Sequence, residues 1–403
     1  MTTTGSDALS RAGLRRVLVV LCVTEITSWG VLYYAFPVLA PSIAADTGWS
    51  ISTITAAFST GLVVSAAVGI PAGRWLDRSG PWPVMTVGSV LGVPAVVGIA
   101  RATTLPWFFA AWTLAGVSMA AVLYQPAFAA LTRWWGPRRV TALTWLTLLA
   151  GLASTIFAPL TAALVERLDW RDTYLVLAGI LAVITIPAHL FGLRGPWPRP
   201  ESVAETAHDP GAVARSRHFV LLVAAVGLGA FTAFAVVVNQ VPLLIERGLS
   251  TSAAAWALGL GGVGQVLGRL GYAGLVATTG VRTRSVLVLA GTALATGLLA
   301  VLPGPPALLV AAAMLAGAAR GLFTLLQATA ITDRWGTAHY GRLGGLLSAP
   351  AMLATALAPW AGAALAEVLG GYPAVFVVLA LVAVVAAVLI AGSVPRTAAD
   401  RRS

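Results

Sequence analysis

Long runs of apolar residues recur along this chain and limit what it can fold into. Crossing about 30 Å of hydrocarbon takes roughly 20 apolar residues, and twelve runs of about that length are present. Backbone N–H and C=O groups in lipid must be satisfied within their own segment, so each run is predicted to be a helix. The predicted spans are residues 16–40, 52–73, 83–101, 105–131, 140–164, 173–193, 218–244, 252–278, 285–302, 306–331, 343–366 and 372–394. The sequence therefore predicts an all-α membrane protein with 12 transmembrane helices.

The composition excludes an ordinary soluble domain. Hydrophobic residues make up 58% of the 403 residues and charged residues only 10%, whereas a soluble domain has about 25% charged residues. The single cysteine, Cys22, lies in the first apolar run, so no disulfide framework is expected. That first run is too long for the hydrophobic region of a signal peptide, and we expect it to be retained as the first helix.

The arginines predict the orientation in the membrane. All 25 basic residues are arginines, and a cytoplasmic N-terminus places 19 of them in cytoplasmic segments. Four fall outside, at Arg101, Arg167, Arg171 and Arg247. This asymmetry predicts that both termini are cytoplasmic, in a multi-pass protein of a prokaryotic inner (plasma) membrane. Because the arginines are scattered singly between apolar runs, the net charge of +11 indicates a lipid bilayer as partner and no nucleic acid.

The two halves of the chain repeat one another. Trp135-Gly136 recurs as Trp335-Gly336, and Ala158-Pro159 recurs as Ala358-Pro359, each at a spacing of 200 residues. The one long polar segment, with four prolines, lies between the halves. We therefore expect an N-terminal six-helix bundle (1–193), a cytoplasmic linker (194–217) and a C-terminal six-helix bundle (218–403). Parallel repeats of this kind are typical of transporters that move two bundles about a central site.

The loop after the second span carries a recognisable motif. It reads GRWLDRSG, and the residues that match the pattern G-x-x-x-D-R/K-x-G are Gly73, Asp77, Arg78 and Gly80. The chain here resembles the major facilitator superfamily. The resemblance implies a two-bundle fold and a gating role for this loop, in which Asp77 and Arg78 contact neighbouring helix ends. The equivalent loop of the second half has Thr278 and Thr279 at the charged positions, so a gating contact of this kind is expected in the first half only. The alternative is that the loop only fixes the topology.

A narrower resemblance is to the monocarboxylate-transporter and oxalate/formate-antiporter branch. The first span contains EITSWG from Glu25 to Gly30, and the chain has Ala158-Pro159 followed by an Asp169-to-Tyr174 stretch. The eighth span carries Gly268-Arg269, where these families place a substrate-facing arginine. The resemblance implies an anionic substrate. The eleventh span has no cationic residue, so we expect a monoanion and not a dicarboxylate.

Three charged residues lie well inside predicted spans, away from the span ends: Glu25, Arg269 and Arg320. Each costs roughly 2.5–3.5 kcal/mol on insertion scales, which makes it a functional candidate. Two arginines against one glutamate leave a positively charged cavity that favours an anion. We expect Arg269 and Arg320 to bind substrate, and Glu25 to be the proton-coupling group because burial and nearby arginines shift its proton affinity in opposite directions.

Polar and aromatic residues at helical spacing extend this candidate site. They come from spans 1, 4, 7, 8 and 10, and central sites form where such helices converge. Individually they can equally be interhelical hydrogen-bond partners. The predicted substrate-binding residues, besides the arginines, are Trp29, Tyr33, Tyr34, Tyr124, Gln125, Asn239, Gln240, Gln265 and Gln327.

Other features are expected to be structural. Gly264 and Gly268, four residues apart, allow close helix packing. His189, near the cytoplasmic end of the sixth span, is expected to be a solvated interfacial residue. One cysteine and four scattered histidines predict no metal site, and the absence of nucleotide-loop and nucleophile motifs predicts no cofactor and no enzyme activity.

The sequence thus predicts a monomeric secondary transporter that moves a small, monocarboxylate-like organic anion with a proton by alternating access. The alternative is a proton-driven efflux antiporter for drug-like compounds or metabolites. In that case Glu25 would bind a cationic or neutral substrate and the aromatic residues would line an apolar cavity. A sensor or receptor built on a transporter scaffold is a third interpretation, from a different functional class.

Overall fold

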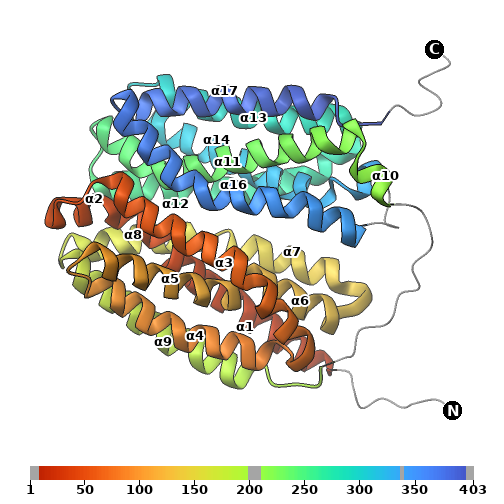
Figure 1. The fold of residues 1–403 in the computed structure, drawn as a ribbon, viewed down its shortest axis with the longest axis horizontal. Coiled ribbons are helices and arrows are strands. Elements are labelled where there is room, and N and C mark those ends of the chain that lie inside the picture. The colour runs from red at the N-terminus through yellow and green to blue at the C-terminus, as the bar shows by residue number, and fades with distance from the viewer. Residues whose placement is uncertain (1–8, 198–209, 336–339, 396–403) are drawn as a thin grey trace. The chain divides into compact units, whose positions relative to one another are not determined.

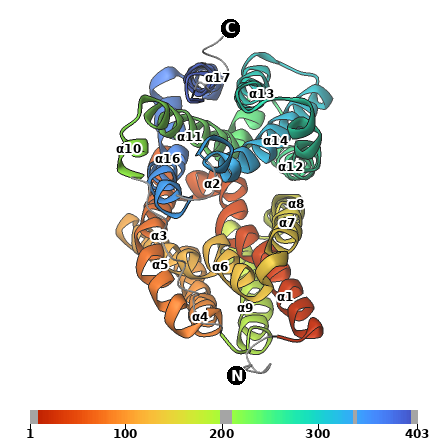
Figure 2. The same ribbon diagram turned by 90° about the vertical axis from the view of Figure 1, so that its right-hand side faces the viewer.

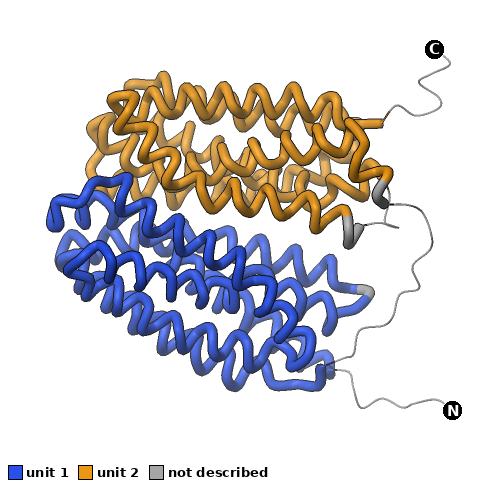
Figure 3. The backbone as a smooth tube through the Cα atoms, viewed as in Figure 1, with its two compact units in different colours: residues 1–203 blue, residues 204–403 orange. Residues whose placement is uncertain are grey.

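The computed structural model describes residues 9–197, 210–335 and 340–395, and within these ranges it contains helices and no strand (Figure 1). Contacts divide the chain into two compact units, Met1–Val203 and Ala204–Ser403 (Figure 3). Each unit is a helical bundle and is described by itself. Half of the predicted linker 194–217 lies outside the described residues, since 198–209 are not among them.

Unit 1 contains six long helical segments, three of them interrupted. The segments are α1 (Arg11–Trp29) with the π-helical turn η1 (Gly30–Tyr34) and α2 (Ala35–Thr47); α3 (Ile51–Ser79); α4 (Pro81–Ala100); α5 (Leu105–Val122) with α6 (Tyr124–Trp135); η2 (Gly136–Arg138) and α7 (Arg139–Ala150) with α8 (Ala153–Val165); and α9 (Trp170–Gly192). The first segment continues beyond its predicted end at residue 40, and Pro41 lies inside α2.

Unit 2 also contains six long helical segments. They are α11 (Arg217–Glu246), α12 (Thr251–Thr278), α13 (Val281–Val301), α14 (Pro306–Thr329), α16 (Tyr340–Leu369) and α17 (Tyr372–Ala391), with short α10 (Pro210–Ala214) and α15 (Thr332–Trp335) (Figure 2). In the described part of the chain, eleven segments are long and apolar enough to cross a membrane. The twelfth, α12, has sufficient length but is less apolar because it carries several glycines, Gln265 and Arg269.

Matching glycine contacts bring two helices together in each unit. A Cβ at Gly116 of α5 would lie 2.1 Å from the Gly61 carbonyl oxygen of α3, and a Cβ at Gly317 of α14 would lie 1.9 Å from the Gly261 carbonyl of α12. Gly264 and Gly268 face α14 carbonyls equally closely, at 2.1 and 2.2 Å. The predicted close packing of the eighth span is therefore confirmed, and it involves backbone contact that any side chain would block.

A carboxylate ties three helices together at one end of unit 1. Asp46 at the end of α2 accepts a hydrogen bond from the Trp170 indole nitrogen at 2.9 Å, at the start of α9. The next residue, Arg171, donates to the carbonyls of Ala100 (2.9 Å) and Ala102 (2.7 Å), where α4 ends. The first, third and sixth segments of the bundle are thereby held at the same end.

Unit 2 repeats two members of this arrangement 200 residues later, although its arginine comes from the end of the first segment and not from the sixth. Glu246, equivalent to Asp46, accepts a hydrogen bond from the Tyr372 backbone nitrogen at 3.0 Å, at the start of α17. Arg247 donates to the carbonyl of Ala300, which is equivalent to Ala100. The internal repeat detected from two dipeptides therefore extends to the contacts that close each bundle.

Candidate functional site

Glu25 is fully buried inside unit 1. Its exposed fraction is 0%, and neither carboxylate oxygen accepts a hydrogen bond from the described residues. The Trp29 indole, one turn further along α1, interacts with the carboxyl, but without a hydrogen bond of regular geometry. Two hydroxyls, those of Ser28 on α1 and Ser154 on α8, are also buried without a partner in the described structure. An unpaired buried carboxyl is costly, which makes Glu25 a candidate functional residue.

The α-helix α1 ends at Trp29 and continues directly as a π-helical turn. The π-helical turn Gly30–Tyr34 inserts a wider ring into the first segment, and such insertions are frequent at functional sites. A Cβ at Gly30 would lie 2.1 Å from the Phe157 ring of α8, so glycine is needed for this close contact. The turn also directs Tyr33 and Tyr34 toward Trp29, with ring centroids 5.3 and 6.3 Å from the indole.

Tyr124 joins this aromatic cluster, whereas Gln125 does not. The Tyr124 ring lies 5.1 Å from the Trp29 indole. Gln125, the next residue, points elsewhere, since a Cβ at Gly69 of α3 would lie 2.9 Å from its amide oxygen. The two residues open α6 after an extended Leu123, and Pro126 in the first turn needs no amide hydrogen. The structure thus brings together Glu25, Trp29, Tyr33, Tyr34 and Tyr124.

Gln125 lines a separate pocket that reaches the loop motif. The pocket holds about 160 Å³ of space that water can enter, and its wall includes Gly69, Gly73, Asp77 and Gln125. Small residues of α3 and α6 form most of the remaining surface. Gly73 faces this space, with nothing within 4 Å of where a Cβ would stand.

The motif predicted as a loop lies mostly in the last turns of α3, because this helix continues to Ser79, and it makes an ion pair within unit 1. Asp77 pairs with Arg133 at the end of α6, at 2.5 Å. Arg133 and the Trp197 indole both donate to the Asp77 carbonyl at 3.2 Å, and the Arg133 guanidinium lies 4.7 Å from the Trp197 ring. Gly80 has a φ of +80°, which favours glycine at this turn. Arg78 is exposed. Sequence reasoning found Asp77 but missed Arg133 and Trp197, for which the local pattern gives no signal.

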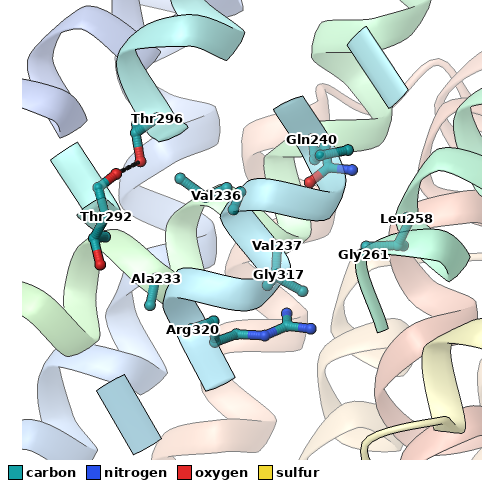
Figure 4. A pocket seen from close by; sticks show the side chains of 12 residues that line it. Ala233, Val236, Val237, Gln240, Leu258, Gly261, Thr292, Thr296, Gly317 and Arg320 are labelled. Carbon is teal, nitrogen blue, oxygen red and sulfur yellow. Dashed lines mark hydrogen bonds between the residues drawn. The ribbon is translucent and has the colours of Figure 1, made fainter. Parts of the chain in front are cut away.

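Arg320 and Gln265 form the polar centre of unit 2. The Arg320 guanidinium donates to the Gln265 amide oxygen at 2.7 Å, and its side chain is only 7% exposed. Arg320 and Gln240 line one pocket together with Thr292, Thr296 and apolar residues of α11 and α14 (Figure 4). Water can enter about 20 Å³ of this pocket, which corresponds to about one molecule. The Gln240 amide nitrogen is buried without a partner in the described residues.

The remaining predicted residues of unit 2 differ in their surroundings. Arg269 is 6% exposed and lies one helical turn after Gln265 on α12, so both side chains share a face. Asn239 donates to the carbonyls of Ala235 (2.8 Å) and Pro359 (3.4 Å), an interhelical contact with α16. Gln327 is half-buried on α14, nearly two turns beyond Arg320.

Unit 2 also has an ion pair here, but the charges are exchanged. The position of Arg133 is taken by an aspartate, which pairs with an arginine. Asp333, equivalent to Arg133, accepts from Arg284 at 2.6 Å. The adjacent Arg334 donates to the hydroxyls of Ser285 and Ser393 at 3.0 Å each. Burial lowers the pKa of the Arg334 guanidinium to about 10, although Asp333 opposes this shift. The sequence comparison of the two loops missed this pair because its arginine lies on α13 and its aspartate on α15.

The expectation for His189 is wrong. The imidazole is fully buried, and its Nδ1 lies 2.7 Å from the Ser89 hydroxyl of α4. Its position near the end of a predicted span suggested solvation, but α9 packs this face against α4. Within the described residues, no group of three or more histidine, cysteine or acidic side chains is placed to hold a metal ion.

Sequence comparison points to membrane transporters. The family model described as Major Facilitator Superfamily matches residues 21–305 and 220–403. Monocarboxylate transporter 13 of Bos taurus is 29% identical over 364 residues, covering 87% of this chain and 81% of that protein. The multidrug resistance protein MdtL of Klebsiella pneumoniae is 30% identical over 228 residues, which are 55% of this chain and 56% of that protein.

Solved structures share the fold. A bacterial homologue of the human lysosomal transporter Spinster, in an inward-facing and unoccupied conformation, gives a TM-score of 0.76 with 14% identity, covering 96% of this chain and 98% of that one. The nucleoside transporter NupG gives 0.72 with 14% identity, covering 95% and 100%. At this identity the likeness concerns the fold alone, and it confirms the predicted all-α transporter architecture.

Proposed function

This chain belongs to the major facilitator superfamily and is an alternating-access membrane transporter, and we propose that it moves a small monocarboxylate-like anion together with a proton. The similarity to a monocarboxylate transporter over 87% of the chain supports this substrate class. The buried charged residues of the two units support separate roles. The arginines proposed to bind the anion, Arg269 and Arg320, lie in unit 2, and the acidic Glu25 lies in unit 1.

The observation that carries the anion assignment is the environment of Arg320. Its buried guanidinium binds the neutral Gln265 amide and forms no ion pair with a carboxylate of the described residues. A permanent charge kept in this setting is costly unless an anion balances it during the working cycle. Guanidinium groups bind carboxylates in a bidentate geometry, which suits a small organic acid. Arg269, on the same face of α12 as Gln265, is the second proposed ligand.

Glu25 is the proposed proton carrier. Its carboxyl has no hydrogen-bond partner in the described structure and no arginine forms an ion pair with it. A buried carboxyl that lacks a partner can carry a proton, and a change of access to water during the transport cycle would release that proton. Cotransport of one anion and one proton is then electrically neutral, which reduces the cost of moving charge through the membrane.

Proton-driven efflux of a cationic or neutral compound is the second candidate function. It is favoured by one observation: the rings of Tyr33, Tyr34 and Tyr124 gather around the Trp29 indole, which lies one helical turn after Glu25. Aromatic faces combined with a carboxylate suit an amine or a flat lipophilic molecule. Similarity to MdtL, a multidrug resistance protein by name, points the same way over 55% of the chain.

Ligand-dependent thermal stability of the purified protein distinguishes the two functions. A small carboxylate at 100 times its Kd stabilises the folded state by about 2.7 kcal/mol, and we expect this effect to disappear in Arg320→Gln and to weaken in Arg269→Gln. Arg101→Gln, an exposed arginine removed from both candidate sites, serves as the matched control. Stabilisation by lipophilic cations that survives Arg320→Gln would instead support efflux.

A further inference from the structure

Two adjoining pockets of unit 2, one basic and one apolar, lie outside the candidate transport site. The first is basic and wide, about 700 Å³, with Arg217, His218 and Leu221 from the start of α11, and Arg282 from the start of α13. The second is an apolar groove of about 560 Å³ between α13 and α17. Ala391, at the end of α17, lines both, so the basic pocket continues into the groove.

The groove follows one face of each helix. On α13 the lining residues are Val286, Ala290, Ala293 and Leu294, which continue the stripe that begins at Arg282. On α17 they are Val384, Ala387, Val388 and Ala391. Figures 1 and 2 both show α13 and α17 side by side. Leu294 and Val388 are 60% and 68% exposed, so this apolar surface is not covered within the unit.

The dimensions match one leaflet of a bilayer. From Arg282 to Leu294 the helix rises about 18 Å at 1.5 Å per residue, against about 15 Å for half of the hydrocarbon core. The basic end lies where α11 and α13 begin and α17 ends. This is the end at which the arginine distribution predicts the cytoplasm.

The basic side chains of the first pocket are available to a ligand. Neither Arg217 nor Arg282 pairs with a carboxylate in the described part of the chain, and the residues that line the two pockets include no acidic side chain. Asp333, a carboxylate that contacts the start of α13, is already bound by Arg284. Two guanidinium groups and an imidazole above an apolar groove complement a phosphate attached to an acyl chain.

We propose that unit 2 binds an anionic phospholipid here, with the headgroup phosphate held by Arg217, Arg282 and His218 and one acyl chain in the α13–α17 groove. Basic pockets on the cytoplasmic side of membrane helices bind anionic headgroups in this manner. The proposal is independent of the transported substrate, because none of these residues belongs to the candidate transport site.

Native mass spectrometry of the detergent-purified full chain, titrated with phosphatidylglycerol or phosphatidylcholine, tests the proposal. We expect preferential binding of phosphatidylglycerol, weakened roughly five-fold for each guanidinium removed in Arg217→Gln/Arg282→Gln. The control Arg11→Gln/Arg15→Gln removes the same charge from exposed positions of α1 and leaves binding unchanged. Ala290→Phe fills the groove without a change of charge and also weakens binding.

Three results would overturn the proposal. Phosphatidylcholine could bind as tightly as phosphatidylglycerol, or the two double variants could bind phosphatidylglycerol equally. Glycerol phosphate could also compete as well as the lipid in wild type and in Ala290→Phe, which would identify a soluble phosphate site. Circular dichroism of each variant confirms that a loss of binding does not reflect unfolding.

Discussion

Glu25 and Trp29 occupy positions where the two repeated units differ in charge and in size. At the 200-residue spacing, Glu25 corresponds to Ala225 and Trp29 corresponds to Gly229, whose surroundings are filled by the Phe323 ring. Unit 2 has in turn Arg320, bonded to Gln265, in its own polar centre. The contacts that close each bundle repeat, whereas the charged residues inside do not. We therefore expect function to depend on the residues at which the repeat breaks.

The Asp77–Arg133 pair is expected to act on transport rate and only weakly on stability. Asp77 is 60% exposed, and an ion pair with such an exposed member contributes only about 0–1 kcal/mol. Asp77→Asn and Arg133→Gln should each slow substrate uptake in proteoliposomes several-fold while thermal stability changes little. The double variant should be no slower than either single one, because both remove the same contact. Additive losses of rate would show that the two residues act separately.

At the scale of helices, glycine contacts determine how closely α12 and α14 pack. Gly317 and Gly261 lie in direct backbone contact, as do Gly116 and Gly61 in unit 1. Small residues of this kind replace the hydrophobic driving force that is missing between helices in lipid. Because α12 carries Gln265 and α14 carries Arg320, the same contact positions the polar centre of unit 2.

Gly317→Ala is therefore expected to destabilise unit 2. The new Cβ would lie 1.9 Å from the Gly261 carbonyl oxygen, so the helices must separate, at a cost of about 1–3 kcal/mol. Gly271→Ala on α12 is the matched control, because nothing lies within 4 Å of its Cβ position and alanine favours a helix. Thermal unfolding of both variants measures the difference. Equal melting temperatures would contradict the packing argument.

Much of the structure at the scale of helices can be predicted from the sequence. Hydrocarbon thickness sets the length of a span, and the spacing of small residues indicates where helices pack closely. The fold class and the close approach of Gly264 and Gly268 were predictable on those grounds. The π-helical turn at Gly30–Tyr34 and the breaks after Val122 and Ala150 were not, since their causes are tertiary contacts such as that of Gly30 with Phe157.

The candidate site was predictable only in part. The rarity of charge in lipid identified Glu25, Arg269 and Arg320, and helical spacing placed Trp29 beside Tyr33. Spacing could not show that adjacent residues diverge, as Tyr124 and Gln125 do at the start of α6. Nor could it show that buried His189 meets Ser89, which lies 100 residues earlier in the chain.

For the whole molecule, the predicted orientation with both termini in the cytoplasm can be tested through its single cysteine. Cys22→Ala gives a cysteine-free chain in which new cysteines report on each side. With a membrane-impermeant maleimide on intact cells, Thr103→Cys between α4 and α5 should be labelled, because the arginine distribution places that loop outside. Ser79→Cys, at the end of α3, should react only after permeabilisation. The reverse pattern would invert the topology.

Proton-driven uptake of a small carboxylate is the central claim, and the most direct measurement follows uptake into proteoliposomes with an imposed pH gradient. We expect an inward proton gradient to accumulate the carboxylate in the wild type. Glu25→Gln should abolish this accumulation while it leaves carboxylate exchange across equal pH intact. Arg320→Gln should abolish both. Accumulation that persists in Glu25→Gln, or a carboxylate flux that never responds to the pH gradient, would contradict the account.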